Sequence, residues 1–328
     1  MPTAIGALSR LMLAPSLADV TFNGRGFPPS PPAARNRLEP VPRAVVVGFE
    51  AGVEARDVQE IEWRLGLVDA ELRGFAYEGA TMALTITDQL RPRRRARARE
   101  LLLGPAGPHL FLTYIGIGFA MARLPRGRWS RVLPDLTGSP YYPDLSWLAV
   151  DGYGFDLAYF NPRRWVQEQR IPRPYPWLGV DGYFSRAVDQ GIGRALWFIH
   201  AAQPRQVAAA VARFPAGRRP DLWSGVGLAA AFAGGADARG VAELAATAAD
   251  HRPELAQGMV FAAKARTFAG FVPAHTELVV GTGCGLSAAE AAGLVDSAVS
   301  ACSTGSDVIY EQWRTYVRNQ FARVGPSV

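Results

Sequence analysis

A repeated glycine-centred segment constrains this chain more than any other feature of its sequence. In six stretches, one or two glycines are followed by small and apolar residues and often by an aromatic one. They read AYEGATMAL (76–84), YIGIGFAMAR (114–123), DGYGFDLAYF (151–160), DQGIGRALWF (189–198), WSGVGLAAAF (223–232) and AQGMVFAAKA (256–265). The aligned anchor positions 79, 118, 154, 193, 227 and 260 are separated by 39, 36, 39, 34 and 33 residues. This spacing is typical of a helix–turn–helix repeat.

The composition of each unit favours closely packed helices. A glycine lacks Cβ and therefore lets a second helix approach its backbone. Between the anchors we expect a second, more polar helix, for example over residues 203–214 and 238–249, with Asp237 and Asp250 at caps or turns. Long runs of alternating β-branched residues are missing, whereas alanine, leucine and arginine are abundant. We predict an all-α protein of about six helical hairpins of 33–39 residues, arranged as an α-solenoid or as a closed α/α ring.

Proline-rich stretches divide the chain. Residues 23–43 read NGRGFPPSPPAARNRLEPVPR, which predicts an extended connector and not a helix. We therefore expect an N-terminal helix and connector over 1–43, the helical-repeat domain over 44–300, and a C-terminal amphipathic helix over 301–328. The first dozen residues are expected to pack on the protein body, the alternative being that they lie on a membrane.

Composition limits the compartment and the partners. Two cysteines are too few for a disulfide framework or a cysteine-based zinc site. No signal peptide is visible, and the longest uncharged run, over 110–122, falls short of the ~20 residues of a spanning helix. We expect a cytoplasmic protein, with attachment to the periphery of a membrane through a partner as an alternative. The sequence leaves the oligomeric state open, including a homo-oligomer.

Polar residues beside the glycines are the first candidates for chemistry. If the units stack in register, these side chains converge along one surface and could bind a polar group or move a proton. The alternative is that each caps the N-terminus of its own helix. The candidates for catalysis are Asp189, Asp151, Glu78 and Arg194, and those for substrate binding are Gln190, Ser224 and Gln257.

The histidines offer one candidate. His275 lies beside Glu277 and follows Lys264 and Arg266 along the chain, which makes it a candidate general acid–base group, although a lone histidine also fits a structural role. Lys264 is a candidate for substrate binding. No histidine has a partner at metal-ligand spacing and there is no HExxH, so we expect no metal site. Walker, dinucleotide and GxSxG motifs are also missing, and the cofactor stays unknown.

Aromatic residues concentrate in the central repeats. They form either an ordinary core or a long groove suited to a flat, apolar, conjugated ligand. The set comprises Trp147, Tyr153, Phe155, Tyr159, Phe160, Trp197, Phe198, Trp223 and Phe232, of which Tyr153, Phe155, Trp197 and Trp223 are candidates for substrate binding.

A run of six arginines, RPRRRARAR (91–99), is the strongest local charge. It is either a solvated face or a patch that docks an acidic partner such as an acyl carrier protein. Nucleic acid is not expected as a partner, because no stacking aromatics or known binding module lie near the run.

Several of these segments together resemble the UnbL-type family of enediyne biosynthesis proteins, a domain-of-unknown-function family (DUF1702). The matching stretches are RGFAYEGATMAL (73–84), YIGIGFAMARLPR (114–126), WLAVDGYGFDLAYF (147–160), AVDQGIGRALWF (187–198), RRPDLWSGVGLAAAFAGG (218–235) and ELAQGMVFAAKARTFAGFVPAHTEL (254–278). They follow the family order over most of residues 48–298, whereas RPRRRARAR and the tail after about Ser300 do not match.

The resemblance implies a role in making a polyketide-derived enediyne core. It implies action after an iterative polyketide synthase, on a linear conjugated polyene, beside a membrane protein and a β-propeller-like protein. The family supplies no catalytic residues to carry over. Two hypotheses follow: an enzyme, or enzyme subunit, that processes the polyene, and a non-catalytic helical-repeat scaffold that holds the polyene, an acyl carrier protein or partner subunits.

Overall fold

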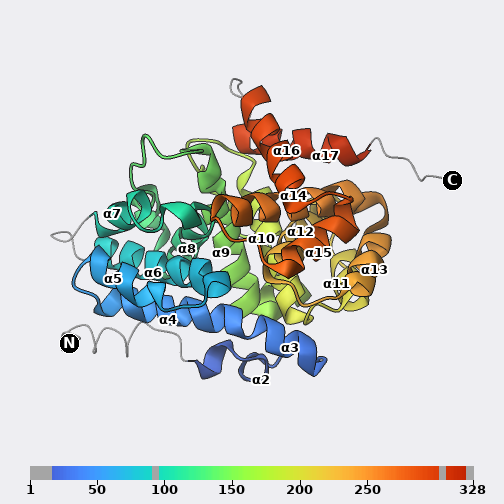
Figure 1. Ribbon diagram of the computed structural model, residues 1–328, viewed down its shortest axis with the longest axis horizontal. Coiled ribbons are helices and arrows are strands. Elements are labelled where there is room, and N and C mark those ends of the chain that lie inside the picture. The colour runs from blue at the N-terminus through green and yellow to red at the C-terminus, as the bar shows by residue number, and fades with distance from the viewer. Residues whose placement is uncertain (1–16, 91–95, 303–307, 323–328) are drawn as a thin grey trace. The chain divides into compact units, whose positions relative to one another are not determined.

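The computed structural model describes residues 17–90, 96–302 and 308–322, and these are organised as helices (Figure 1). Within them there is no strand, only an isolated bridge between Trp177 and Val180. The prediction of an all-α protein is therefore confirmed. The chain divides into two compact units. The first comprises Met1–Gly26 and Glu39–Asp156, and the second comprises Phe27–Leu38 and Leu157–Val328.

Helices of the first unit pack through glycine. Its elements are η1 (Ala18–Val20), α2 (Phe22–Arg25), α4 (Pro40–Glu54), α5 (Val58–Gly66), α6 (Ala70–Leu90), α7 (Arg97–Leu103), η3 (Gly107–His109), α8 (Leu110–Arg123), η4 (Arg126–Arg131), η5 (Asp144–Ser146) and the larger part of α9 (Trp147–Phe160). A Cβ on Gly79 of α6 would lie 1.9 Å from the carbonyl oxygen of Val45 in α4, and one on Gly118 of α8 would lie 2.0 Å from that of Ala149 in α9. Only glycine fits at such contacts.

The second unit repeats this packing. Its elements are α3 (Pro32–Leu38), the π-helical turn η6 (Arg163–Gln167), α10 (Phe184–Ile199), α11 (Pro204–Ala212), η7 (Ala216–Arg218), α12 (Arg219–Ala233), α13 (Ala238–Ala248), η8 (Ala249–His251), α14 (Arg252–Phe268), α15 (Ala274–Cys284), α16 (Ala288–Ala301) and α17 (Ile309–Ala322). The glycine helices α10, α12 and α14 pack one on the next, and the intervening helices α11, α13 and α15 do the same. The close contacts are reciprocal: Gly193 of α10 meets the Leu222 carbonyl of α12, and Gly225 of α12 meets the Gln190 carbonyl of α10.

The helices expected between the anchors are present. Residues 203–214 were predicted to be helical and contain α11, and residues 238–249 contain α13. Asp237 caps α13, because its side chain accepts a hydrogen bond from the backbone N–H of Gly240 at 2.8 Å. Helix α17, with Tyr310, Trp313 and Val317 buried, lies within the C-terminal segment for which an amphipathic helix was expected.

The extended connector predicted over residues 23–43 is wrong. Helix α3 begins at Pro32, and α4 begins at Pro40 directly after its N-cap residue Glu39. Proline is well suited to the first turn of a helix, where its missing N–H would have no helical partner and its fixed φ is already helical. These prolines therefore begin helices and do not exclude them. The helix expected over the first dozen residues lies outside the described part of the chain.

No single helix among the described residues is long and apolar enough to cross a membrane. Two pairs of helices reach that length and hydropathy only when joined across bends of 89° and 70°.

Candidate functional site

Three of the predicted polar residues meet in the second unit. Gln190, Ser224 and Gln257 each precede a glycine, on α10, α12 and α14 respectively, and each is at most 1% exposed. The hydroxyl of Ser224 donates to Gln257 Oε1 at 3.0 Å and lies 3.4 Å from Gln190 Oε1. Stacking of successive glycine helices in register therefore brings these side chains into one buried row, as expected from the repeat.

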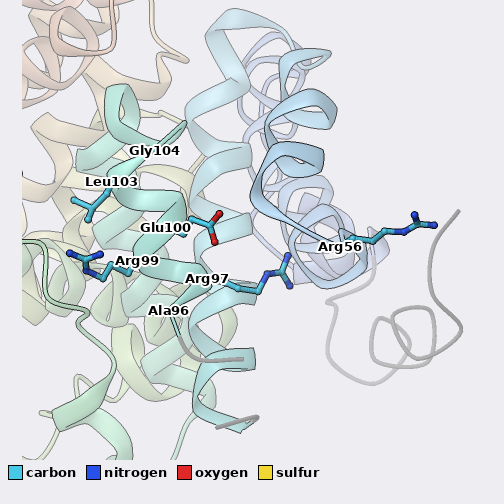
Figure 2. Close-up of a pocket in the computed structure, with 7 residues that line it drawn as sticks. All are labelled: Arg56, Ala96, Arg97, Arg99, Glu100, Leu103 and Gly104. Carbon is cyan, nitrogen blue, oxygen red and sulfur yellow. The ribbon is translucent and has the colours of Figure 1, made fainter. Parts of the chain in front are cut away.

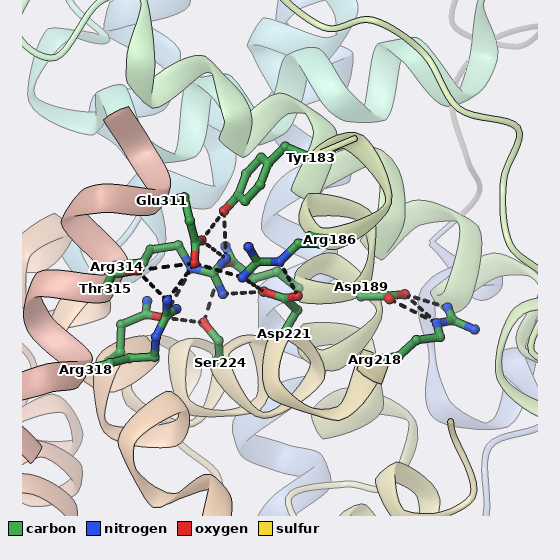
Figure 3. Close-up of polar contacts among 12 residues, drawn as sticks. Tyr183, Arg186, Asp189, Arg218, Asp221, Ser224, Glu311, Arg314, Thr315 and Arg318 are labelled. Atoms are coloured by element: carbon green, nitrogen blue, oxygen red, sulfur yellow. Dashed lines mark hydrogen bonds and ion pairs between the residues drawn. The ribbon is translucent and has the colours of Figure 1, made fainter. Parts of the chain in front are cut away.

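Helix α17 covers this row of polar side chains. The fully buried Arg314 donates from Nε to Gln257 Oε1 at 3.2 Å, and the amide of Gln190 donates to the Tyr310 hydroxyl at 3.2 Å. Arg314 also donates to Asp221 Oδ1 at 2.8 Å and to the Tyr183 hydroxyl at 2.7 Å (Figure 3). The row is thus closed by side chains of the same protein.

Asp221 and Glu311 lie at the centre of an ionic network (Figure 3). Arg186 binds Asp221 at 3.0 Å and Glu311 at 2.8 Å, and Arg318 binds Glu311 at 2.6 Å. With Arg314, three guanidinium groups face two carboxylates. Burial opposes ionisation of Glu311, but the three arginines outweigh it and lower its pKa to about 2.

Tyr183 links this network through its hydroxyl. It donates to Glu311 Oε2 at 2.7 Å and accepts from Arg314. Burial raises its pKa well above 10, although Arg314 opposes that shift. Tyr183 therefore stays protonated and does not act as a base near neutral pH.

Asp189 pairs with an arginine that sequence analysis did not select. Arg218, at the N-cap of α12, donates from Nε to Asp189 Oδ2 at 2.9 Å, and its own Nη1 reaches the carbonyl of Gln169. Burial raises the pKa of Asp189, while Arg218 opposes the rise. Arg194, another candidate for catalysis, is also buried on α10. The ion pair of Asp189 is formed with Arg218.

His275 holds the C-terminal end of α12. Its Nε2 lies 3.1 Å from the Phe232 carbonyl oxygen, which also accepts from Arg266 at 2.6 Å. Arg37 contacts His275 Nδ1 at 2.5 Å and donates to the Ala233 carbonyl at 3.2 Å. Burial lowers the pKa of His275 to about 4, so the imidazole is neutral near pH 7. These contacts satisfy carbonyl groups that a helix end leaves without helical partners.

The other predicted residues lie in different surroundings. Lys264 pairs with Asp296 at 2.6 Å, and Trp197 is a fully buried core residue that donates to the Gly234 carbonyl at 2.8 Å. Trp223 is buried on α12. The first unit contains the candidates Glu78, Asp151, Tyr153 and Phe155, whereas Asp189 belongs to the second unit.

Aromatic residues of the first unit pack as core. Tyr153 meets Trp129 edge to face, with ring centroids 4.9 Å apart, and Phe155 meets Phe119 at 5.7 Å. Most of the aromatic residues of the central repeats are buried, in agreement with the ordinary-core alternative.

The capping alternative for the polar residues is wrong. Asp189, Ser224 and Gln257 lie inside helices that begin at Phe184, Arg219 and Arg252, so none occupies an N-cap. Each helix starts more than one turn before its candidate polar residue, and in α12 and α14 a proline lies in the first turn.

Sequence analysis missed Tyr183, Arg186, Arg218, Asp221, Glu311 and Arg314. A signal for one of them was available: Arg314 lies four residues after Tyr310 and three before Val317, on the face of α17 that buries apolar side chains. A charged residue on such a face needs a buried partner. The partner, Asp221, is 93 residues away, and no feature of the sequence around it indicates that it pairs with Arg314.

The ionic network stabilises buried charged side chains, but its groups are poorly suited to proton transfer. Its carboxylates accept hydrogen bonds from arginines, which stay protonated. Among the described residues, no group of three histidine, cysteine or acidic side chains could hold a metal ion.

Comparison with known proteins identifies a family. The model of a family described as "Protein of unknown function (DUF1702)" matches residues 4–321. No curated protein and no solved structure matches the chain.

Proposed function

Because the chain belongs to the DUF1702 family, we propose that it is an accessory protein of enediyne core biosynthesis. It acts after the iterative polyketide synthase, binds a linear conjugated polyene or its carrier, and works beside a membrane protein and a β-propeller-like protein. The proposal is supported by the stretches that resemble UnbL-type proteins across residues 48–298 and by the family match over nearly the whole chain.

We propose binding and not catalysis as its mode of action. The observation that carries this choice is the internal pairing of the candidate charges. Asp189 binds Arg218, and Asp221 binds Arg314 and Arg186. A general acid or base has to reach the proton that it transfers, directly or through one water. Carboxylates that are buried within ion pairs of their own chain are poorly suited to that role and well suited to fixing helices in place.

We also propose that the helical hairpins stack as an α-solenoid or a closed α/α ring. The successive packing of α10, α12 and α14, with α11, α13 and α15 beside them, supports this within the second unit. Repeat stacks of this kind offer long surfaces for extended ligands or partner proteins.

Catalysis is the second candidate function, and one observation favours it. The pKa of Asp189 is raised by burial despite the adjacent Arg218. A carboxyl group with a raised pKa is a candidate general acid.

Both candidate functions, binding and catalysis, can be tested in a producing cell from which the chain is removed and to which wild-type or variant chains are then supplied. We expect removal of the chain to stop core formation and the wild-type chain to restore it. Asp189→Asn should restore it too, because the amide oxygen still accepts a hydrogen bond from Arg218, although the second acceptor oxygen is lost. Asp250→Asn, at an exposed position, is the matched control.

Two outcomes of this experiment contradict the proposal. Core formation that continues without the chain would remove it from the pathway. Loss of core formation in Asp189→Asn alone, with the variant protein present at wild-type abundance, would favour the enzyme.

A further inference from the structure

A basic surface in the first unit is independent of the polar network in the second. It surrounds a cavity of about 690 Å³ beside α7, lined by Arg56, Arg97, Arg99, Glu100 and Leu103 among others. Figure 2 shows Arg99 on one side of α7 and Arg97 on the other, where Arg97 extends toward the segment that carries Arg56. The described lining residues thus include three arginines and one glutamate.

Backbone carbonyl groups hold two of these arginines in position. Arg97 donates from Nη2 to the carbonyl of Ala55 at 3.1 Å, and Arg99 donates from Nε to that of Asp135 at 2.8 Å. A carbonyl oxygen carries no formal charge, so a hydrogen bond to it orients a guanidinium without neutralising it. A guanidinium also carries five N–H donors in a planar fork that matches carboxylate geometry. The positive charge is thus placed in advance for an acidic partner.

Apolar side chains accompany this charge. Leu103 lines the cavity and is 42% exposed. Trp63 of α5, the helix that packs against α7, is 68% exposed, and Leu67, directly after α5, is 74% exposed. Exposed tryptophan and arginine side chains are the residues that contribute most at protein interfaces.

We infer that the surface formed by Arg56, Arg97, Arg99 and Leu103 docks the acidic face of an acyl carrier protein. The charge complementarity selects an acidic protein, and the mixture of arginine with exposed apolar side chains suits a folded partner more than a phosphate backbone. This inference rests on the proposed function, since the carrier is the protein that would deliver the polyene from the synthase.

Binding of the full chain to the excised carrier domain of the polyketide synthase tests the inference. We expect Arg56→Glu and Arg99→Glu each to weaken binding at least fivefold, because each replaces an attraction by a repulsion at an exposed position. Arg239→Glu, on the exposed face of α13 in the second unit, changes the net charge equally and should alter the affinity less than twofold. Wild-type affinity should fall as salt is raised from 50 to about 300 mM, through the range in which the Debye length drops below about 10 Å.

The other outcomes overturn the inference. Equal weakening by Arg99→Glu and Arg239→Glu would show an effect of net charge alone. No carrier binding, or binding of a short DNA duplex that Arg99→Glu abolishes, would assign the surface to another partner. Polyene binding by the same variants separates the two proposals: if it persists while carrier binding is missing, only the docking surface is wrong.

Discussion

Replacement of Gly225 by alanine tests how far the glycine contacts determine this fold. A Cβ at that position would lie 1.9 Å from the Gln190 carbonyl oxygen and 2.7 Å from the Arg194 nitrogen. Ordinary contacts begin near 3.4 Å, so α10 and α12 would have to separate by about 1.5 Å. Overpacking of this kind costs about 1–3 kcal/mol, and the Ser224–Gln190 contact would be lost with about 1 kcal/mol more. Helix propensity returns about 1 kcal/mol for alanine.

The expected net effect of Gly225→Ala is a decrease of about 1–3 kcal/mol in the free energy of unfolding. Gly293→Ala is the matched control, because Gly293 lies inside α16 with no neighbour within 4 Å of the added Cβ. It should raise the stability by about 0.5–1 kcal/mol. Urea unfolding followed by circular dichroism measures both. Equal changes in the two variants, or a Gly225→Ala protein as stable as the wild type, would refute the reasoning.

Three further predictions concern charged and titrating groups. Arg314→Met leaves Asp221 buried with one partner fewer and should cost about 3–5 kcal/mol in urea unfolding, whereas Arg205→Met, at an exposed pair with Glu243, should cost less than about 1 kcal/mol; similar losses would contradict the buried network. The pKa of Glu311 falls from 4.5 to about 2 on folding, so its stabilisation is present above pH 4.5 and is lost as the pH falls toward 2; Glu311→Gln should flatten the acid limb of the stability curve, and an unchanged slope would argue against the ion pairs. The pKa of His275 falls from 6.5 to about 4, so the unfolded chain binds more protons in this window and stability should decline as the pH drops from 6.5 to 4; His275→Gln should reduce that decline in unfolding experiments between pH 7 and 5, and an identical decline would place His275 in a more exposed environment.

The all-α fold and its glycine contacts could be predicted from the sequence because their physical cause is local. A glycine where two helices cross is needed at each contact, so the spacing of positions such as 193 and 227 records the spacing of helices. The contacts among Gln190, Ser224 and Gln257 have the same cause, since each residue directly precedes a glycine in one of the successively packed helices α10, α12 and α14.

The ionic network could not be predicted in the same way. Asp221 and Arg314 are brought together by the docking of α17, a segment outside the repeat, and contacts between distant segments leave no periodic pattern. Asp189, selected from the sequence as a candidate for catalysis, is buried, and its partner Arg218 belongs to the turn before α12, outside the glycine-centred segments. The prediction of an extended connector over residues 23–43 is wrong because its prolines were interpreted as helix breakers, whereas Pro32 and Pro40 begin helices.

Absorbance spectroscopy of a linear conjugated polyene titrated with the purified protein tests the central claim most directly. Binding without catalysis predicts polyene bands that shift on addition of protein and then persist over time. Progressive loss of the bands with formation of a new product would contradict the claim and make the protein an enzyme in its own right. Bands that neither shift nor fade at saturating protein concentration would contradict polyene binding itself.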